Sequence, residues 1–166
     1  MEKVAVFYGS DSGATKRVAA LIAEQFSAEC YDIADSDVED FEQYELVILG
    51  SPTVNNGEVQ SDWDYVLDDV EDLDLANTKV AIFGLGDQVE YADTFVDAMA
   101  EIAEACEEAG ADIIGKWPTE GYNHSESRSE DDGEFIGLAI DNERQADQTQ
   151  TRVEKWANQL KVAAAF

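Results

Sequence analysis

The sequence has little of several residue types that would narrow its function. Among its 166 residues there are two cysteines, Cys30 and Cys106, far apart and in no CxxC pair. Neither a disulfide framework nor a metal site is therefore expected. The one histidine, His124, lies in a polar stretch, and we expect it to be exposed to solvent rather than to act as a catalytic base.

Positive charge is also scarce. Ten Lys and Arg residues stand against 38 Asp and Glu residues, which gives a formal net charge of −28 at pH 7. Such a chain should be repelled by nucleic acid and by anionic membranes, so basic proteins are the expected partners. No Lys or Arg occurs from Val18 to Thr78, and acidic residues crowd between Asp62 and Asp74. This acidic surface is interpreted either as a docking face or as an adaptation to a salty cytoplasm.

Long apolar runs are absent as well. No apolar stretch has the length of a bilayer, and the first residues lead into a short strand-like segment without the apolar core of a signal peptide. A cytoplasmic protein is therefore expected. With 45% apolar and 10% aromatic residues, the chain is long enough for one well-buried core, so a single domain spanning residues 1–166 is predicted.

The sequence does contain short apolar runs that alternate with amphipathic stretches. Strands are predicted at residues 4–8, 30–33, 46–49, 80–83 and 113–117. Stripes of apolar residues with helical spacing predict helices between and after them, one beginning near Phe95, and Ser61 is expected to cap another. This alternation predicts an α/β fold in which helices cover both faces of a parallel sheet.

One polar segment interrupts the alternation. Residues 119–134 hold a single large apolar side chain, Tyr122, and an apolar run resumes at residues 135–140. This pattern indicates an insertion within the region of the last strand. Trp117 is expected to belong to a strand, whereas Trp63 and Trp156 are expected to be packing residues.

Three unusual loops follow the first, third and fourth predicted strands, where ligands bind in open α/β sheets. The first, residues 10–15, begins a helix, so its backbone N–H groups can converge on an anion. It lacks both the Lys-Ser/Thr ending of a triphosphate loop and the GxGxxG pattern of a dinucleotide fingerprint, so a single phosphate monoester fits better. The other two loops, residues 50–58 and 84–93, contain glycines that allow a close approach of the backbone to a ligand.

Six segments together resemble the flavodoxins, the small electron carriers that contain FMN, and the resemblance runs almost from end to end. The segments are residues 7–15, 50–53, 57–63, 83–88, 91–93 and 137–141. The polar insertion between Trp117 and Phe135 is similar to the extra loop of the long-chain subgroup. The resemblance implies a flavodoxin-like, doubly wound sheet of five parallel strands in the order 2-1-3-4-5, with an insertion in the last strand and FMN at the switch point.

The resemblance also implies which residues bind FMN. The first loop would hold the phosphate, the second would line one face and the N5 edge of the isoalloxazine ring, and Tyr91 would stack on the other side. Asp141 corresponds to a position near the cofactor in long-chain members. The implied cofactor-binding residues are Ser10, Asp11, Ser12, Gly13, Ala14, Thr15, Pro52, Thr53, Val54, Asn55, Asn56, Gly57, Gly86, Asp87, Tyr91 and Asp141.

The sequence departs from the family pattern at three positions. Val54 stands where many long-chain members have a tryptophan that stacks on the flavin. Loss of such a contact, about 1 kcal/mol by analogy with aromatic pairs, should loosen FMN and alter its potentials. Asn56 stands where an apolar residue is common, and Ala14 replaces a polar or basic residue.

The implied function is that of a low-potential one-electron carrier and not of an enzyme. FMN would supply the redox chemistry, and the negative charge of the protein would disfavour the anionic, fully reduced flavin. The peptide between Asn55 and Asn56, or between Asn56 and Gly57, can turn its carbonyl toward a protonated flavin N5. Electrons would come from a basic partner such as a ferredoxin/flavodoxin-NADP reductase and pass to redox enzymes. A monomer with no nucleic-acid or membrane partner is expected.

Two alternatives with the same topology remain. One is a flavin-dependent enzyme of the NAD(P)H:quinone reductase type, although the sequence shows neither a second nucleotide fingerprint nor a catalytic set of residues for bond-making. The other is a phosphoacceptor receiver domain, which needs an acidic cluster where the first strand ends. Here that strand ends in Tyr8-Gly9-Ser10.

Overall fold

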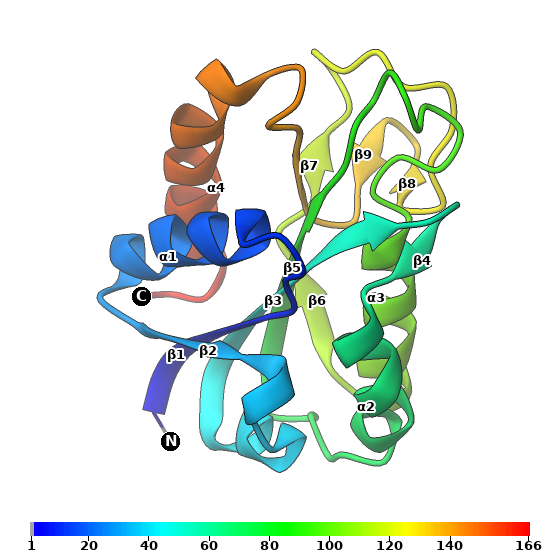
Figure 1. Cartoon of the computed structure of the whole chain (residues 1–166). Coiled ribbons are helices and arrows are strands. Elements are labelled where there is room, and N and C mark those ends of the chain that lie inside the picture. Colours follow the sequence, from blue (N-terminus) through cyan, green and yellow to red (C-terminus); the bar gives the residue numbers. More distant parts are fainter. Residues whose placement is uncertain (1) are drawn as a thin grey trace.

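Five parallel strands form the centre of the computed structural model, which describes residues 2–166 (Figure 1). Their order across the sheet is β2-β1-β3-β5-β10. The strands are β1 (Glu2–Tyr8), β2 (Glu29–Asp32), β3 (Tyr44–Val54), β5 (Lys79–Leu85) and β10 (Leu138–Ile140). Because β10 is the last of these along the chain, the expected order 2-1-3-4-5 is confirmed.

The last strand position of the sheet is filled by two separate segments. β6 (Asp112–Ile114) pairs with the first half of β5, and β10 pairs with its second half, with Leu138 beside Phe83. The chain between them forms a small antiparallel sheet of β7 (Trp117–Pro118), β8 (Glu130–Asp131) and β9 (Glu134–Phe135). The predicted insertion in the last strand is therefore confirmed, and Trp117 does begin a strand.

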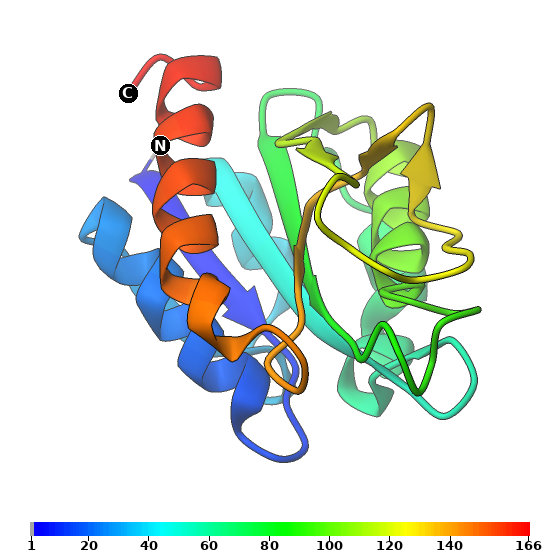
Figure 2. The same cartoon turned by 90° about the horizontal axis from the view of Figure 1, so that it is seen from above.

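Helices cover both faces of the sheet, as predicted (Figures 1 and 2). On one face lie α1 (Ala14–Phe26) and α4 (Thr149–Ala163), and on the other lie α2 (Ser61–Glu71) and α3 (Ala98–Glu108). Short 3₁₀ turns occur at Ile33–Asp35, Val38–Gln43 and Ala146–Gln148. Trp156 packs on the α1 side of the sheet and Trp63 on the other, and both are fully buried as expected. Within residues 2–166, no helix is both long and apolar enough to cross a membrane.

Two helix starts differ from the sequence prediction. α3 begins at Ala98, and Phe95 is a buried residue of the turns before it. Ser61 is the first residue of α2 and not its cap, because the side-chain oxygen of Gln60 accepts the hydrogen bond from the backbone N–H of Asp62 at 3.1 Å. Both differences arise at helix ends, where local patterns are least decisive.

The predicted exposure of His124 is wrong. Its side chain is only 7% exposed, and its Nε2 is hydrogen-bonded to Glu130. The imidazole lies 5.2 Å from the rings of both Phe95 and Phe135, measured between centroids. The polar insertion therefore folds over an aromatic cluster to which it contributes few apolar residues of its own.

Candidate functional site

The three loops predicted to bind a ligand meet at one edge of the sheet. This follows from the parallel direction of β1, β3 and β5, and Figure 2 shows the loops in its lower part together with the turn after β10. Two backbone hydrogen bonds of 3.0 Å join these segments at their bases. Gly9 N–H, before the first loop, donates to the carbonyl of Gly50 in the second loop, and Gly86 N–H of the third loop donates to the carbonyl of Ile140 at the end of β10. The structure thus brings together residues that lie far apart in the sequence.

The first loop presents a row of unused hydrogen-bond donors. Gly13 takes a left-handed conformation, with φ of 91°, and its N–H donates to Ser10 Oγ at 3.0 Å. The next N–H groups, those of Ala14, Thr15 and Lys16, have no acceptor in the described part of the chain. Thr15 is only 1% exposed, and its hydroxyl has no partner there either. An anion would satisfy these groups, and the dipole of α1 favours one at this end.

Gln60 holds the side chain of Asp11, the carboxylate of the first loop that would repel a bound anion. Its Nε2 donates to Asp11 Oδ1 at 2.9 Å and to Asp62 Oδ2 at 2.7 Å, and its backbone N–H donates to Ser51 Oγ at 3.2 Å. The Asp11 carboxylate is therefore held by a neighbouring loop. Sequence reasoning missed Gln60, although its place directly before a helix was a usable signal.

The second loop is a β-hairpin and not an irregular loop. β3 continues to Val54 and pairs with β4 (Glu58–Val59), with Thr53 opposite Val59. The turn between them needs positive φ at Asn55 (51°) and Gly57 (93°), which suits these residue types. Thr53 Oγ1 accepts a 3.0 Å hydrogen bond from the backbone N–H of Ala98, so the hairpin is fastened to the start of α3. Its tip remains exposed.

A buried carboxyl group lies against this hairpin tip. Asp97 is 4% exposed, and its Oδ1 accepts a hydrogen bond from the backbone N–H of Arg128 at 2.7 Å. A β-carbon added to Gly57 would come within 2.9 Å of Asp97 Oδ2, so only glycine fits there without a shift. Burial raises the pKa of Asp97, and the nearby Arg128 opposes this only in part. Sequence reasoning missed Asp97 because it stands within an apolar helical stripe.

The third loop is organised by Asp87. Its Oδ1 accepts hydrogen bonds of 3.0 Å from the backbone N–H groups of Val89 and Glu90 and from Arg144 Nε, while Oδ2 accepts from Arg144 Nη2 at 3.2 Å. The hydrogen bonds from Arg144 are the main cause that lowers the pKa of Asp87. The Asp87 carbonyl accepts the N–H of Tyr91, whose side chain is 45% exposed. Asp87 therefore shapes the loop that presents Tyr91.

Asp141 is fully buried and joins this loop to the turn after β10. Its Oδ2 accepts from the backbone N–H of Gln88 at 3.0 Å and from Gln88 Nε2 at 2.8 Å. Its Oδ1 accepts from the N–H groups of Glu143 and Arg144, each at 3.0 Å. All four bonds are internal, so Asp141 acts by positioning the loops.

Replacing Arg144 by Gln should destabilise the protein at pH 7 and have little effect in acid. The pKa of Asp87 is lower in the folded than in the unfolded chain. The ion pair therefore contributes stability above about pH 4, the unfolded value, and loses it as the pH falls through the lower folded value. We expect the melting temperature to fall by a few degrees at pH 7, with the gap closing below pH 4. Lys116→Gln, which removes an exposed cation without an ion pair, is the control. If the difference in melting temperature between Arg144→Gln and the unchanged protein does not change with pH, the stabilising role assigned to the ion pair of Arg144 with Asp87 is contradicted.

The site as a whole offers binding groups rather than reactive ones. Within residues 2–166, no group of three or more His, Cys, Asp or Glu side chains is arranged to hold a metal ion. Its donors are backbone N–H groups and a threonine hydroxyl, its flat group is an exposed tyrosine, and its carboxylates are mostly engaged internally. Such a set can hold a phosphate at one end and a planar ring beside it.

Comparisons of the sequence with known proteins lead to one family. The flavodoxin family model matches residues 6–156. A flavodoxin of Picosynechococcus sp. is 43% identical over an alignment of 167 positions that covers 98% of each chain. Flavodoxin 1 of Escherichia coli is 45% identical over 159 residues, covering 93% of this chain and 90% of its own.

Comparisons of the structure agree. The crystal structure of Fusobacterium nucleatum flavodoxin bound to flavin mononucleotide has a TM-score of 0.93 and 25% identity, and the match covers 98% of this chain and 99% of that one. Oxidised flavodoxin 1 from Bacillus cereus, at 24% identity and a TM-score of 0.73, shares the fold over 96% of this chain and 98% of its own.

Proposed function

The chain belongs to the flavodoxin family, and from this premise we propose how its own residues hold FMN and set its potential. It is an FMN-dependent electron carrier and not an enzyme, and flavodoxins take electrons from reductases and pass them to redox enzymes. When bound, FMN supplies the one-electron chemistry. The chain has to bind it, orient it and surround it with charge.

The phosphate of FMN is proposed to bind at the start of α1. The observation that supports this most strongly is the set of unpartnered donors there: the N–H groups of Ala14, Thr15 and Lys16 and the hydroxyl of Thr15. Ser12 is exposed beside them and can add its hydroxyl. These groups fit one phosphate monoester without any lysine, because each charge-assisted hydrogen bond contributes more than a neutral one.

The ring of the cofactor is proposed to lie between the hairpin and the third loop. Tyr91 would stack on one face, and Val54 would contact the other from the end of β3. The exposed tip at Asn55 and Asn56 would meet the N5 edge, where a backbone carbonyl of the tip would be available as a hydrogen-bond acceptor. Gly57 permits the required turn, and Asp97 limits how far that turn can move.

The surrounding charge favours a low potential and a basic electron donor. A protein of net charge −28, with the buried carboxyl group of Asp97 against the hairpin, opposes additional negative charge in the site. The same charge would attract a basic reductase of the ferredoxin/flavodoxin-NADP type, with an association rate that falls as salt rises. We place the carrier in the cytoplasm as a monomer, and its two cysteines, Cys30 and Cys106, are free thiols.

The proposal is tested by adding flavins to the apoprotein. We expect FMN to bind at least about tenfold more tightly than riboflavin, which lacks the phosphate that the α1 donors would hold. A visible spectrum during stepwise reduction should show a distinct one-electron stage. A protein that takes up no FMN, or that binds both flavins equally, would contradict the site. Oxidation of NADPH without an added reductase would instead favour the quinone-reductase alternative.

Replacing Val54 by Trp should tighten FMN binding about fivefold. A tryptophan at the end of β3 would add an aromatic contact with the ring, worth about 1 kcal/mol. Fluorescence titration of apoprotein with FMN measures the change. Val162→Trp on α4, at an exposed position outside the three loops, is the matched control. Equal effects of both substitutions would place Val54 away from the ring.

A further inference from the structure

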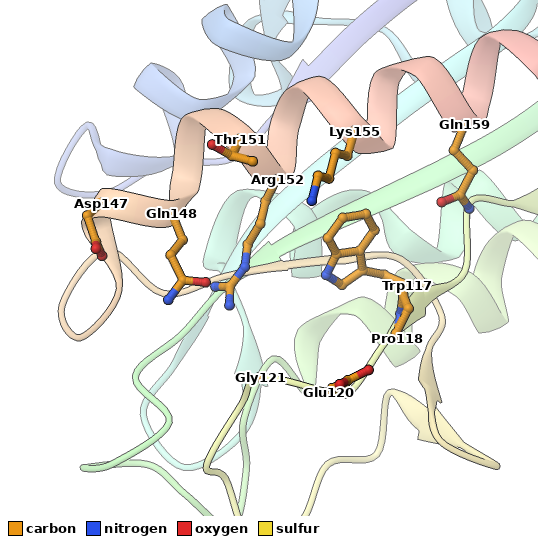
Figure 3. Close-up of a pocket in the computed structure, with 10 residues that line it drawn as sticks. All are labelled: Trp117, Pro118, Glu120, Gly121, Asp147, Gln148, Thr151, Arg152, Lys155 and Gln159. Atoms are coloured by element: carbon orange, nitrogen blue, oxygen red, sulfur yellow. The ribbon is translucent and has the colours of Figure 1, made fainter.

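A cavity of about 510 Å³ lies between α4 and the first segment of the insertion (Figure 3). Trp117 and Pro118 of β7 line one side, and Arg152 and Lys155 of α4 line the other. None of its lining residues belongs to the three loops of the FMN site. Its volume falls within the usual range for small-molecule sites, about 300–1,000 Å³.

Arg152 is a buried cation that lacks an anion. It is only 7% exposed, yet it forms no ion pair with any described residue of a chain that has 38 acidic residues. Its Nη1 donates to Gln145 Oε1 at 2.8 Å, and its guanidinium carbon lies 4.2 Å from the ring centre of Tyr122. Nε and Nη2 have no acceptor within residues 2–166. Because Arg152 lines the cavity, these donors are open to a ligand there, and an anion could accept hydrogen bonds from both.

Lys155 adds a second unpaired cation to the same cavity. Figure 3 shows its ammonium group directed toward the indole of Trp117, and within the described residues it forms no ion pair. By contrast, Arg128 and Arg144 both pair with carboxylates. The cavity therefore contains two positively charged side chains without ion pairs to any described residue, although the protein as a whole is strongly acidic.

The cavity also limits the charge that a ligand can carry. Glu120 and Asp147 are among its lining residues, so its two cations are balanced by two carboxylates. In Figure 3, Asp147 lies at the end of the cavity opposite Gln159, and its carboxylate does not point toward Arg152. A doubly charged anion such as phosphate would be repelled by these groups, whereas a single negative charge beside Arg152 would not.

We propose that this cavity binds a small aromatic monocarboxylate. The two free donors of the planar guanidinium match the two oxygens of a carboxylate, and Lys155 adds a further positive charge. The ring of the ligand would rest against Trp117, whose indole projects from β7 toward α4 in Figure 3. This site is separate from the FMN site and does not depend on the role proposed for that site.

The test follows the indole N–H signal of Trp117 by NMR in the FMN-loaded protein, assigned with Trp117→Phe. The probe is 2-naphthoate, and the comparison compounds are 2-naphthalenemethanol and sulfate. We expect a saturable shift with naphthoate, and neither saturation with the alcohol nor competition by sulfate at equal ionic strength. A shift that is equal for the alcohol, no saturable shift at all, or equally tight binding of sulfate would overturn the proposal.

Variants of α4 provide the second part of the test. Lys155→Gln should weaken naphthoate binding about fivefold, and Arg152→Gln at least about tenfold. Lys161→Gln on the same helix, where the lysine lies over Phe26, should leave the affinity unchanged. Because Arg152 is buried, its replacement can disturb folding, and Lys155→Gln then decides the question. Unchanged affinity in Lys155→Gln would overturn the proposal.

Discussion

Replacing Tyr91 by Ala is expected to weaken FMN binding about thirtyfold. Stacking of the tyrosine ring on the isoalloxazine would remove apolar surface of both from water, which corresponds to about 2 kcal/mol. Because Tyr91 is 45% exposed, its loss should cost little folding stability. The effect should therefore appear in the dissociation constant for FMN, measured by quenching of flavin fluorescence, and not in the melting temperature of the apoprotein.

Two control variants separate stacking from other causes. Tyr91→Phe keeps the ring and should bind FMN within about twofold of the original affinity. Tyr65→Ala removes another exposed tyrosine, 87% exposed on α2, and should change neither affinity nor stability. If Tyr91→Ala binds FMN as tightly as the unchanged protein, Tyr91 does not contact the ring.

Raising the salt concentration from about 0.1 M to 1 M KCl is expected to stabilise the folded protein by about 3 kcal/mol, or about 10 °C in melting temperature. Ion pairs among residues 2–166 are few; those involving Lys79, Arg128 and Arg144 are examples, and all three cations lie at least partly in solvent. Repulsion within a net charge of −28 therefore outweighs attraction, and salt screens the repulsion more than it weakens the pairs. Thermal unfolding followed by circular dichroism measures the change.

The pH dependence at low salt supplies an independent check on this charge balance. Burial is the largest cause that raises the pKa of both Asp97 and Glu101. A carboxyl group with a folded pKa above its unfolded value contributes stability that is fully present below about pH 4 and is lost as the pH rises through the folded value. Stability at low salt should therefore increase as the pH falls from 7 toward 4. Two results of the KCl experiment would contradict charge screening as the cause of stabilisation. One is a melting temperature that falls with added KCl, and the other is an equal rise in melting temperature with sucrose at matched osmolality.

The strands and the alternation of strands and helices were accessible from the sequence because they depend on local patterns, whereas the strand order came from the resemblance to the flavodoxins. Apolar runs mark the strands, and a loop such as Ser10 to Thr15 can be recognised as an anion site from its own composition and its place before a helix. Gly57 likewise allows the tight turn of the hairpin, which sequence reasoning expected only as a loop.

Contacts between segments that lie far apart in the chain could not be predicted from the sequence. Gln60 holds Asp11 across 49 positions in the sequence, and Arg144 holds Asp87 across 57. The polar surroundings of His124 in the sequence suggested solvent, but two phenylalanines from other segments enclose its ring. Each of these depends on tertiary packing, which no pattern within a short window records.

The divided last strand sets an order in which the sheet can form. β6 can pair with β5 as soon as α3 has formed between them, whereas β10 must return to β5 across the whole insertion, and such distant pairings slow folding. At Gly137 a β-carbon would come within 1.8 Å of the Ile82 carbonyl oxygen, so the returning chain docks tightly against β5. Ile140 of this late strand and Asp141 directly after it accept hydrogen bonds from Gly86 and Gln88 of the third loop. The proposed FMN site is thus completed only when the sheet closes, and the cofactor should slow unfolding while leaving the rate of folding nearly unchanged.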